Sequence, residues 1–381
     1  MSDSTLEILP SEMRACVYDA SAPHGLTLKP LHKTPTSVSA PGRLYGYGNV
    51  VVKVHSFGVN PVDAKYIVGD KLPETWMDWC ASRVTGHVPG FDFSGVIVKV
   101  PEGVDCGYKV GDEVFGLADD PTCISRRYMN GSFAEYISPP LNQIAPKPTS
   151  LTHAQAAALP LVGTTAVQAF WEHGLKSGQR VLIVGASGGV GHVAVQVANL
   201  QGAEVVAVCS GSNTEFVTGI GAKTVLDYRE GDIFEKIKKN AEEFGAYDLI
   251  LDCVNSADSR DQAASYKVNI LKLGGSVVKR GSGVDSHNYI VLGGASLEWT
   301  QAAIKRFTKL NIFAANFELF WIKMPGCTPA LELIKELCDR EGGGGLKPNM
   351  SESEFSEENT RKAFETLRGR RTAGKIVLNI L

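Results

Sequence analysis

The sequence has no closely spaced cysteines. Its 8 cysteines are scattered over 381 residues, and none forms a C-x-x-C pair. This spacing is unlike that of a zinc cluster, and disulfide frameworks usually place their cysteines in much shorter secreted chains. We therefore expect reduced, mostly buried thiols in a cytoplasmic protein.

Long apolar runs and a strong charge of either sign are also missing. No run of about 18 apolar residues occurs, so no transmembrane helix is expected. The N-terminus MSDSTLEILPSEMR is acidic and has no apolar core, which argues against a secretory signal. The formal net charge is −3 and basic runs are short, so nucleic acid is not an expected partner.

Short β-rich segments, separated by glycine and proline, fill the N-terminal part of the chain. Their composition and turn signals predict an antiparallel, partly barrel-like domain. The segments are NVVVKVHSFGVN (49–60), FDFSGVIVKV (91–100), DEVFGLA (112–118) and SFAEYIS (132–138).

Strands and helices alternate from about residue 160 onward, which predicts an α/β domain with a doubly wound parallel sheet. The expected strands are RVLIVG (180–185), EVVAVC (204–209), TVLDY (224–228), DLILDCV (248–254), SVVKRG (276–281) and, as the last, NIFAANF (311–317). A tail follows, with helices expected at 329–340 and near 357–368 and a closing strand at 375–381. Because this tail comes after the sheet, we expect it to pack against the first domain.

The strongest chemical signal is the stretch VLIVGASGGVGHVAVQVA. A buried strand ends at Gly185, a glycine turn follows, and a helix begins near Gly189. This is the context of a dinucleotide-binding fingerprint, although its first glycine is replaced by Ala186. Gly188 would let the backbone approach a pyrophosphate, and Gly191 would let helix and strand pack closely. We therefore expect a dinucleotide cofactor on the N-terminus of this helix.

The tip of the next strand predicts which cofactor binds. NAD sites usually carry an acid there, which binds the ribose 2′-hydroxyl. Here the tip reads Cys-Ser-Gly-Ser-Asn from Cys209 to Asn213, and the nearest acid, Glu215, is expected to open the following helix. Small hydroxyls leave room for a 2′-phosphate, and Arg229 beside Tyr228 supplies a positive charge. These residues favour NADPH.

Several motifs resemble, in their order, a known family. They are GVNPVD (58–63), PGFDFSG (89–95), GDEVFG (111–116), GSFAEY (131–136), LVGTTA (161–166), GASGGVG (185–191) and GKIVL (374–378). Together they resemble the medium-chain dehydrogenase/reductase superfamily, and within it the zinc-free quinone oxidoreductase branch. The loop at 70–88 and the tail are similar to the subgroup that contains the reticulon-4-interacting protein and the chloroplast-envelope quinone oxidoreductase homologue.

The resemblance implies a domain organisation. A GroES-like substrate domain would be formed by both chain ends, residues 1–160 and 322–381, and a Rossmann dinucleotide-binding domain would occupy residues 161–321. Members of the family are often homodimers joined through the edge of the Rossmann sheet, which here implies the segment 311–317.

The resemblance also implies site residues. The implied cofactor-binding residues are Thr165, Ala186, Ser187, Gly188, Gly189, Val190, Gly191, Ser210, Asn213, Tyr228, Cys253 and Val254. Where relatives often carry a lysine, this chain has Asn213, which weakens the assignment of NADPH. Asn60 and Tyr66 match polar positions of the substrate cleft and are the expected catalytic hydrogen-bond donors, while Phe91 would give the cleft an apolar wall. From the residues alone, Tyr66 can equally be a packed aromatic, and Asn60 can be a turn residue before Pro61.

A metal is not expected. At the three positions where zinc-dependent relatives have their ligands, this chain has Asn60, Phe91 and Leu161, which do not offer the thiolate, imidazole or carboxylate that zinc prefers. Asp92, between Phe91 and Phe93, is expected to make structural hydrogen bonds.

The expected activity is hydride transfer from NADPH to quinones such as 9,10-phenanthrenequinone or benzoquinones. Two alternatives are an NADPH-dependent reductase of enals or enones and a non-catalytic NADPH-binding scaffold or sensor. Turnover of NADPH with any of these acceptors would distinguish the enzymes from the scaffold.

Overall fold

A computed structural model describes most of the chain. The described residues are 9–19, 21–22, 25–38, 48–63, 86–103, 105–118, 131–254, 265–279, 288–293, 298, 301–302, 304, 317–320, 322–323, 326–342, 344–369 and 372–380. The chain divides into two compact units, here called unit 1 (Met1–Thr164 and Met324–Leu381) and unit 2 (Thr165–Lys323). Unit 1 is therefore built from both ends of the chain.

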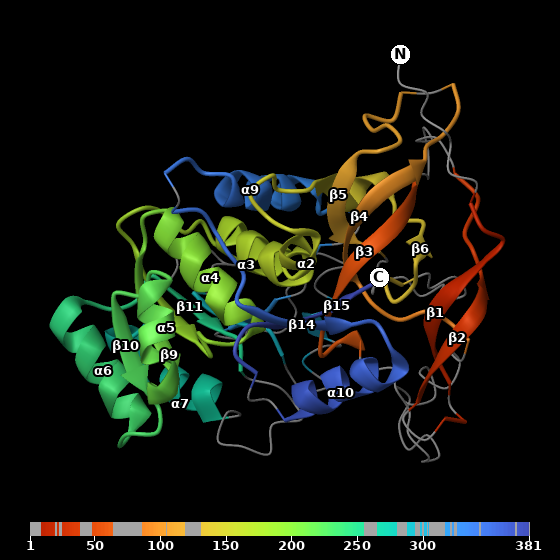
Figure 1. Cartoon of the computed structure of the whole chain (residues 1–381). Coiled ribbons are helices and arrows are strands. Elements are labelled where there is room, and N and C mark those ends of the chain that lie inside the picture. Colours follow the sequence, from red (N-terminus) through yellow and green to blue (C-terminus); the bar gives the residue numbers. More distant parts are fainter. Residues whose placement is uncertain are drawn as a thin grey trace. The chain divides into compact units, whose positions relative to one another are not determined.

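Unit 1 contains a seven-stranded sheet. Its strands, in spatial order, are β14 (Met350–Glu354), β15 (Lys375–Asn379), β3 (Val51–Val59), β4 (Asp92–Lys99), β5 (Glu113–Leu117) and β7 (Ile144–Pro146), and β6 (Tyr136–Ile137) pairs with β3 off this path. Figure 1 shows β15, in blue, beside β3, in orange, and the two strands pair antiparallel with Ile376 opposite Val59. This pairing brings Lys375 close to Asn60, the residue that follows β3.

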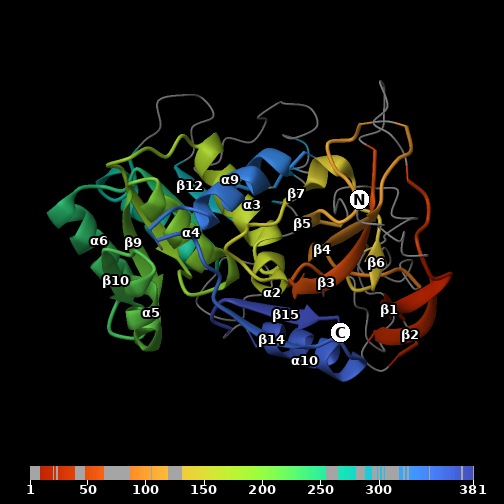
Figure 2. The same cartoon turned by 45° about the horizontal axis from the view of Figure 1, so that its top comes forward.

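Smaller elements complete unit 1. β1 (Glu12–Tyr18) and β2 (Leu26–Lys33) form a two-stranded antiparallel sheet, and the described helices include α2 (His153–Ala157), α9 (Thr328–Cys338) and α10 (Glu357–Arg368), with a 3-10 turn at Leu141–Gln143. Figure 2 shows α10 running beside β14 and β15. Aromatic rings fill the core: Phe57 stacks on Phe133 with ring centroids 4.4 Å apart and meets Phe355 edge-on.

The described residues of unit 2 form a six-stranded parallel sheet. Its strands, in spatial order, are β10 (Thr224–Asp227), β9 (Glu204–Cys209), β8 (Arg180–Val184), β11 (Leu249–Asp252), β12 (Tyr289–Val291) and β13 (Glu318–Leu319). In chain order this is 3-2-1-4-5-6, the order of a Rossmann fold. The described helices of unit 2 include α4 (Gly189–Leu200), α5 (Thr214–Gly219), α6 (Ile233–Phe244) and α7 (Ser265–Leu273), and α3 (Pro160–Glu172) contains the boundary between the units. The central strand β8 is buried along its whole length, as expected for a parallel strand covered on both faces.

One strand prediction in unit 2 needs correction, and another lies mostly outside the described residues. SVVKRG (276–281) was expected as the fifth strand, but its described residues make only a bridge, between Val278 and Tyr247. The fifth strand is β12, which pairs with the carboxyl half of β11. Two adjacent apolar residues after glycines are too few to show a periodicity. The sequence pattern therefore does not distinguish an isolated bridge from a strand here. The prediction of a last strand at 311–317 lies outside the described residues except for Phe317, and the described strand that follows is β13, Glu318–Leu319.

Candidate functional site

The glycine turn of unit 2 joins the end of β8 to the start of α4. Gly185 has a φ of 77°, a conformation that favours glycine. A Cβ atom on Gly191 would lie 2.1 Å from the carbonyl oxygen of Gly185, so helix and strand approach this closely only with glycine at position 191. Gly185 supplies the left-handed turn residue, which explains how Ala186 is accommodated in the fingerprint.

Helix α4 begins without a side-chain cap. Its N-cap is Gly188, whose carbonyl oxygen accepts the first backbone hydrogen bond of the helix. The N–H groups of Gly189, Val190 and Gly191 therefore have no acceptor within the helix. Apart from its chain neighbours, a Cβ atom on Gly188 would find one atom of the described residues within 4 Å, the Gly185 oxygen at 3.3 Å, so the approach is open on that side. Together with the helix dipole, these donors fit a pyrophosphate.

Polar side chains connect this turn to the tip of β9. The Asn213 amide nitrogen donates to Ser187 Oγ and to Ser210 Oγ, both at 3.1 Å, and Ser210 Oγ lies 2.9 Å from Ser212 Oγ. Three predicted cofactor positions, Ser187, Ser210 and Asn213, therefore form one contiguous cluster. Asn213, which stands where relatives often have lysine, holds the other two in place.

An acid lies at this strand tip that sequence reasoning missed. Asp227 ends β10, directly opposite Cys209 in the parallel register, and a Cβ atom on Gly211 would lie 2.2 Å from Asp227 Oδ2. Its other oxygen accepts the Arg229 backbone N–H at 2.8 Å. The guanidinium of Arg229 lies 5.8 Å from the ring centroid of the half-exposed Tyr228. The sequence alone contained one signal for this acid, which is its position at the end of an expected strand. The carboxyl ends of neighbouring parallel strands meet at one edge of the sheet, so this position brings the acid near the tip of β9.

Two further predicted cofactor positions follow β11. Cys253 donates its N–H to the Val184 oxygen at 3.1 Å, and Val254 Cγ2 lies 2.4 Å from the place that a Gly185 Cβ atom would occupy. Both therefore lie against the glycine turn, and burial raises the pKa of the Cys253 thiol. Thr165 lies on α3, at the start of unit 2.

A buried polar cluster occupies unit 1 where β3, β4 and β15 meet. Asp92, fully buried, accepts from Lys375 Nζ and Asn60 Nδ2 through Oδ2, both at 2.9 Å, and from the Leu161 N–H through Oδ1 at 2.7 Å. Lys375 Nζ also donates to Asn60 Oδ1. The expected structural role of Asp92 is thus confirmed.

A second carboxyl group belongs to this cluster. Asp63 is fully buried, and its Oδ2 accepts the Asn60 backbone N–H at 2.7 Å, while Oδ1 has no hydrogen-bond partner among the described residues. Burial raises the pKa of Asp63 well above its usual range, and the nearby Asp92 raises it further. The hydrogen bonds from Asn60 and the charge of Lys375 act in the opposite direction and lower the pKa of Asp63.

The remaining substrate-cleft predictions stay predictions. Tyr66 lies outside the described residues. The Phe91 ring is buried, with 1% of the residue exposed, next to Asp92 in unit 1.

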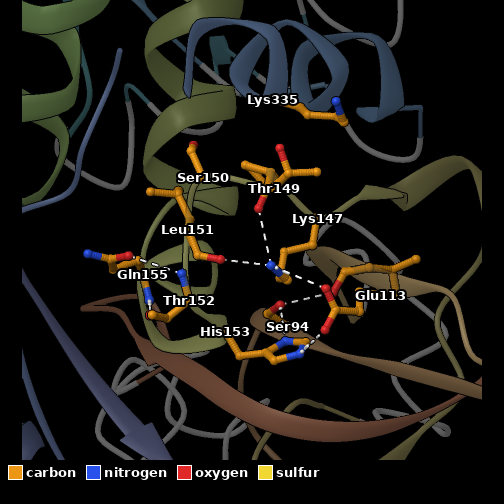
Figure 3. A network of polar contacts seen from close by, with 12 residues as sticks. Ser94, Glu113, Lys147, Thr149, Ser150, Leu151, Thr152, His153, Gln155 and Lys335 are labelled. Atoms are coloured by element: carbon orange, nitrogen blue, oxygen red, sulfur yellow. Dashed lines mark hydrogen bonds and ion pairs between the residues drawn. The ribbon is translucent and has the colours of Figure 1, made fainter. Parts of the chain in front are cut away.

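Ser94, His153 and Glu113 form a second polar network in unit 1, shown in Figure 3. Ser94 Oγ lies 2.8 Å from His153 Nδ1, and His153 Nε2 lies 3.2 Å from Glu113 Oε1. This order of groups is that of a hydrolase triad. Ser94, however, is fully buried and its hydroxyl lies 3.0 Å from the Val114 oxygen, so no substrate reaches it. The network therefore ties α2 to β4 and β5, and Lys147 joins it through Glu113 at 3.3 Å.

This network predicts a pH dependence of stability. Burial lowers the pKa of His153 to about 4, and His55, stacked on it at 4.3 Å, lowers it too, whereas Glu113 raises it and Lys147 lowers it. In the unfolded chain the His153 ring binds a proton below about pH 6.5, whereas in the folded protein it does so only near pH 4. The folded state therefore loses stability as the pH falls from about 6.5 to about 4. We expect unit 1 to lose about 1–2 kcal/mol over this range, after screening of a partly exposed ring. Urea unfolding of the wild type and of His153→Gln at several pH values measures this loss. The free energy of unfolding of the variant should depend less on pH, and an equal pH dependence of the two proteins would contradict the role of His153.

The comparisons with known proteins agree with this architecture. Residues 46–149 match the family described as alcohol dehydrogenase GroES-like domain, and residues 189–314 match the one described as zinc-binding dehydrogenase. The chain is 31% identical over 355 residues to the Mus musculus protein named NAD(P)H oxidoreductase RTN4IP1, mitochondrial, covering 87% of this chain and 82% of that protein. It is 32% identical over 279 residues to the 2-methylene-furan-3-one reductase of Solanum lycopersicum, covering 72% of this chain and 64% of that protein. The chain belongs to the medium-chain dehydrogenase/reductase superfamily.

A solved structure shows the same fold. The quinone oxidoreductase of Coxiella burnetii superimposes with a TM-score of 0.69 at 24% sequence identity, covering 97% of this chain and all of that chain. The predicted combination of a Rossmann sheet with a GroES-like domain is confirmed. Among the described residues, no helix is long and apolar enough to cross a membrane. The cytoplasmic location stays a prediction, since the mouse relative is named as mitochondrial.

The name of one matched family raises the question of zinc. Within the described part of the chain, no three His, Cys, Asp or Glu side chains are grouped to hold a metal. Of the three positions compared with zinc ligands, Asn60 and Leu161 are both bound to Asp92, and Phe91 is its neighbour. These residues do not fit zinc, and we derive no step through it.

Proposed function

We propose that the protein is an NADPH-dependent reductase that transfers hydride to quinones. The observation that carries this proposal is the uncapped start of α4 on the glycine turn, at the carboxyl end of the central strand, with the hydroxyl cluster of Ser187 and Ser210 beside it. Family membership supports the broader class, an NAD(P)H-dependent oxidoreductase. Unit 2 would bind the cofactor, and unit 1 would supply the substrate groups.

The preference for NADPH depends on charge at the tip of β9. The hydroxyls of Ser210 and Ser212, the exposed Tyr228 and the cation Arg229 together suit a 2′-phosphate. Asp227 disfavours a 2′-phosphate, because an acid near the ribose favours a free 2′-hydroxyl. We give more weight to Arg229, because Asp227 already accepts the Arg229 backbone N–H and because the acid of β9, Glu204, begins the strand, at the end opposite to Cys209.

This balance gives a prediction about Arg229. Arg229→Ala should raise the Kd of NADPH about 10- to 100-fold and leave that of NADH unchanged, since one charge-assisted contact to phosphate contributes about 1.5–3 kcal/mol. Lys223→Ala is the matched control, because Lys223 precedes the same strand at its opposite end and pairs with Glu204. Fluorescence titration measures both affinities. An equal loss for the two cofactors would contradict the assignment.

The chemistry needs little acid–base help from the protein. The bound nicotinamide supplies a hydride, that is, two electrons and one proton. A quinone that accepts it becomes a hydroquinone anion and takes one proton from solvent, so quinone, NADPH and one proton give hydroquinone and NADP⁺. The residues of this chain would bind the acceptor oxygen by hydrogen bonds, with Asn60 and Tyr66 as the expected donors.

A second candidate is reduction of enals or enones. The tomato relative is named for a conjugated methylene ketone, and a quinone presents the same conjugated carbonyl. Here hydride would add to the β-carbon, negative charge would develop on the carbonyl oxygen, and a proton would return to the α-carbon. The same oxygen contact to Asn60 would serve both reactions.

An acceptor screen tests the proposal. NADPH consumption is followed with 9,10-phenanthrenequinone, 1,4-benzoquinone and an enal, each against NADH. We expect the quinones to be the best acceptors and NADPH the better donor. Tight NADPH binding without reduction of any acceptor would instead indicate a scaffold or sensor.

Dimerisation through segment 311–317 remains part of the proposal, and light scattering tests it.

A further inference from the structure

A buried carboxylate ends strand β11, beside the glycine turn of unit 2. Asp252 is fully buried, and each of its carboxylate oxygens accepts a hydrogen bond. Oδ1 accepts the backbone N–H of Val254 at 3.0 Å, and Oδ2 accepts the phenol hydroxyl of Tyr289 at 2.9 Å. The proposed hydride transfer uses neither side chain, so the reaction itself does not explain why a carboxylate is buried here.

The bond to Val254 fixes the turn that follows β11. A carboxylate that binds the N–H two residues further on closes a local ring, which restricts the backbone between the two residues. The N–H of Cys253, inside this ring, donates to the Val184 oxygen of β8 at 3.1 Å. The turn after β11 is thus held both by Asp252 and by the central strand of the sheet.

This turn places Val254 against Gly185. A Cβ atom on Gly185 would lie 2.4 Å from Val254 Cγ2, so the valine side chain packs directly on the glycine. Val254 is half-buried, and part of its apolar surface is therefore exposed. It follows the carboxyl end of β11, the edge at which open α/β sheets bind their ligands.

Tyr289 orients the carboxylate. It pairs with Ile250 in the parallel register of β11 and β12, and only 1% of it is exposed. Burial raises the pKa of the Tyr289 phenol well above its usual range, and Asp252 raises it further, so the hydroxyl keeps its proton and donates it to Oδ2. Rotation about the last torsion of an aspartate is otherwise soft, so this bond keeps Oδ1 directed at Val254.

We propose that Asp252 and Tyr289 are positioning residues of the cofactor site, which hold Val254 against the glycine turn as a wall for the dinucleotide. This role rests on the proposed function, because it requires that NADPH binds at the start of α4. Both side chains are buried, so they act through the backbone of Val254 and not by touching the cofactor. A wall that is already ordered before binding strengthens affinity, because the cofactor does not have to order it.

Isothermal titration of Tyr289→Phe with two ligands tests this role. The variant should raise the Kd of NADPH about tenfold, the size of losing one hydrogen bond to a charged group. It should leave the Kd of adenosine 2′,5′-bisphosphate unchanged, because the 2′-phosphate would bind at Ser210 and Arg229, and β8 separates that end of the sheet from β11. An equal loss for both ligands would show a general loosening of the sheet and would overturn the proposal.

A double-mutant cycle identifies the residue through which Tyr289 acts. Val254→Ala should itself weaken NADPH binding, because it removes most of the wall. If Tyr289 acts through Val254, adding Tyr289→Phe to Val254→Ala weakens binding no further. Multiplication of the two losses would contradict the role.

Tyr247→Phe is the matched control for folding. Tyr247 is a fully buried tyrosine that precedes β11, at the opposite end of the sheet, and its hydroxyl donates to Asn240 Oδ1 at 2.7 Å. This variant should lose stability in urea as Tyr289→Phe does, and yet keep the wild-type Kd of NADPH. The same loss of affinity in both variants would overturn the proposal.

The binding measurements also separate this role from the proposed function. A wild type that binds no NADPH would overturn the proposed function and this role together. Wild-type affinity for NADPH in Tyr289→Phe would overturn this role alone.

Discussion

Asp92→Ala should destabilise unit 1 by about 3–5 kcal/mol, the cost of leaving a buried charge without its partner. The carboxylate of Asp92 accepts hydrogen bonds from Asn60, Leu161 and Lys375, so its removal leaves an ammonium and two further donors buried. Chemical denaturation monitored by the aromatic signal of the unit 1 core measures the loss.

The partner variant distinguishes charge from packing. Asp92→Ala combined with Lys375→Met removes both ions, and it should recover part of the stability that Asp92→Ala alone loses. A loss below about 1 kcal/mol for Asp92→Ala would show that solvent or other groups compensate the ammonium, contrary to the buried cluster described for unit 1.

Gly191→Ala should weaken NADPH binding about 10- to 100-fold, because the added methyl group forces the turn apart. Its Cβ atom would lie 2.1 Å from the Gly185 oxygen and 2.8 Å from Ala186 Cα, both backbone atoms. The helix must therefore move, and its first-turn N–H groups move with it.

The matched control for Gly191 lies in the same unit. Gly219→Ala adds the same methyl group on α5, where no described atom outside the neighbouring residues and the backbone of the helix lies within 4 Å, and it should leave binding unchanged. Isothermal titration with NADPH compares the two variants. Wild-type affinity in Gly191→Ala would mean that the pyrophosphate does not bind at this turn.

The Rossmann sheet is readable from sequence because its signals are local. β8, β9 and α4 carry continuous apolar runs and a glycine turn, and the strands lie where the runs do. β14 is different: its residues Met-Ser-Glu-Ser-Glu are mostly exposed, and only pairing with β15 makes them a strand. A polar edge strand has no period-2 apolar pattern, so its sequence gives no signal.

The candidate site likewise has one part that the sequence predicts and another part that only the structure shows. Ser187, Ser210 and Asn213 follow from the family pattern on a recognised motif, and the structure adds that one amide links them. The pairing of Asp92 with Lys375 spans 283 positions and arises from the return of the chain to unit 1. The acid Asp227 was missed because it belongs to the neighbouring strand, and only the β9–β10 register brings it near Gly211.

The central claim is direct hydride transfer from NADPH to a conjugated carbonyl, and a single-turnover experiment tests it most directly. The enzyme is loaded with NADPH carrying deuterium at the transferred position and mixed with 9,10-phenanthrenequinone. We expect consumption of the cofactor to be slower than with unlabelled NADPH and faster than with NADH. Stoichiometric NADPH binding with no consumption by the quinone would contradict the account.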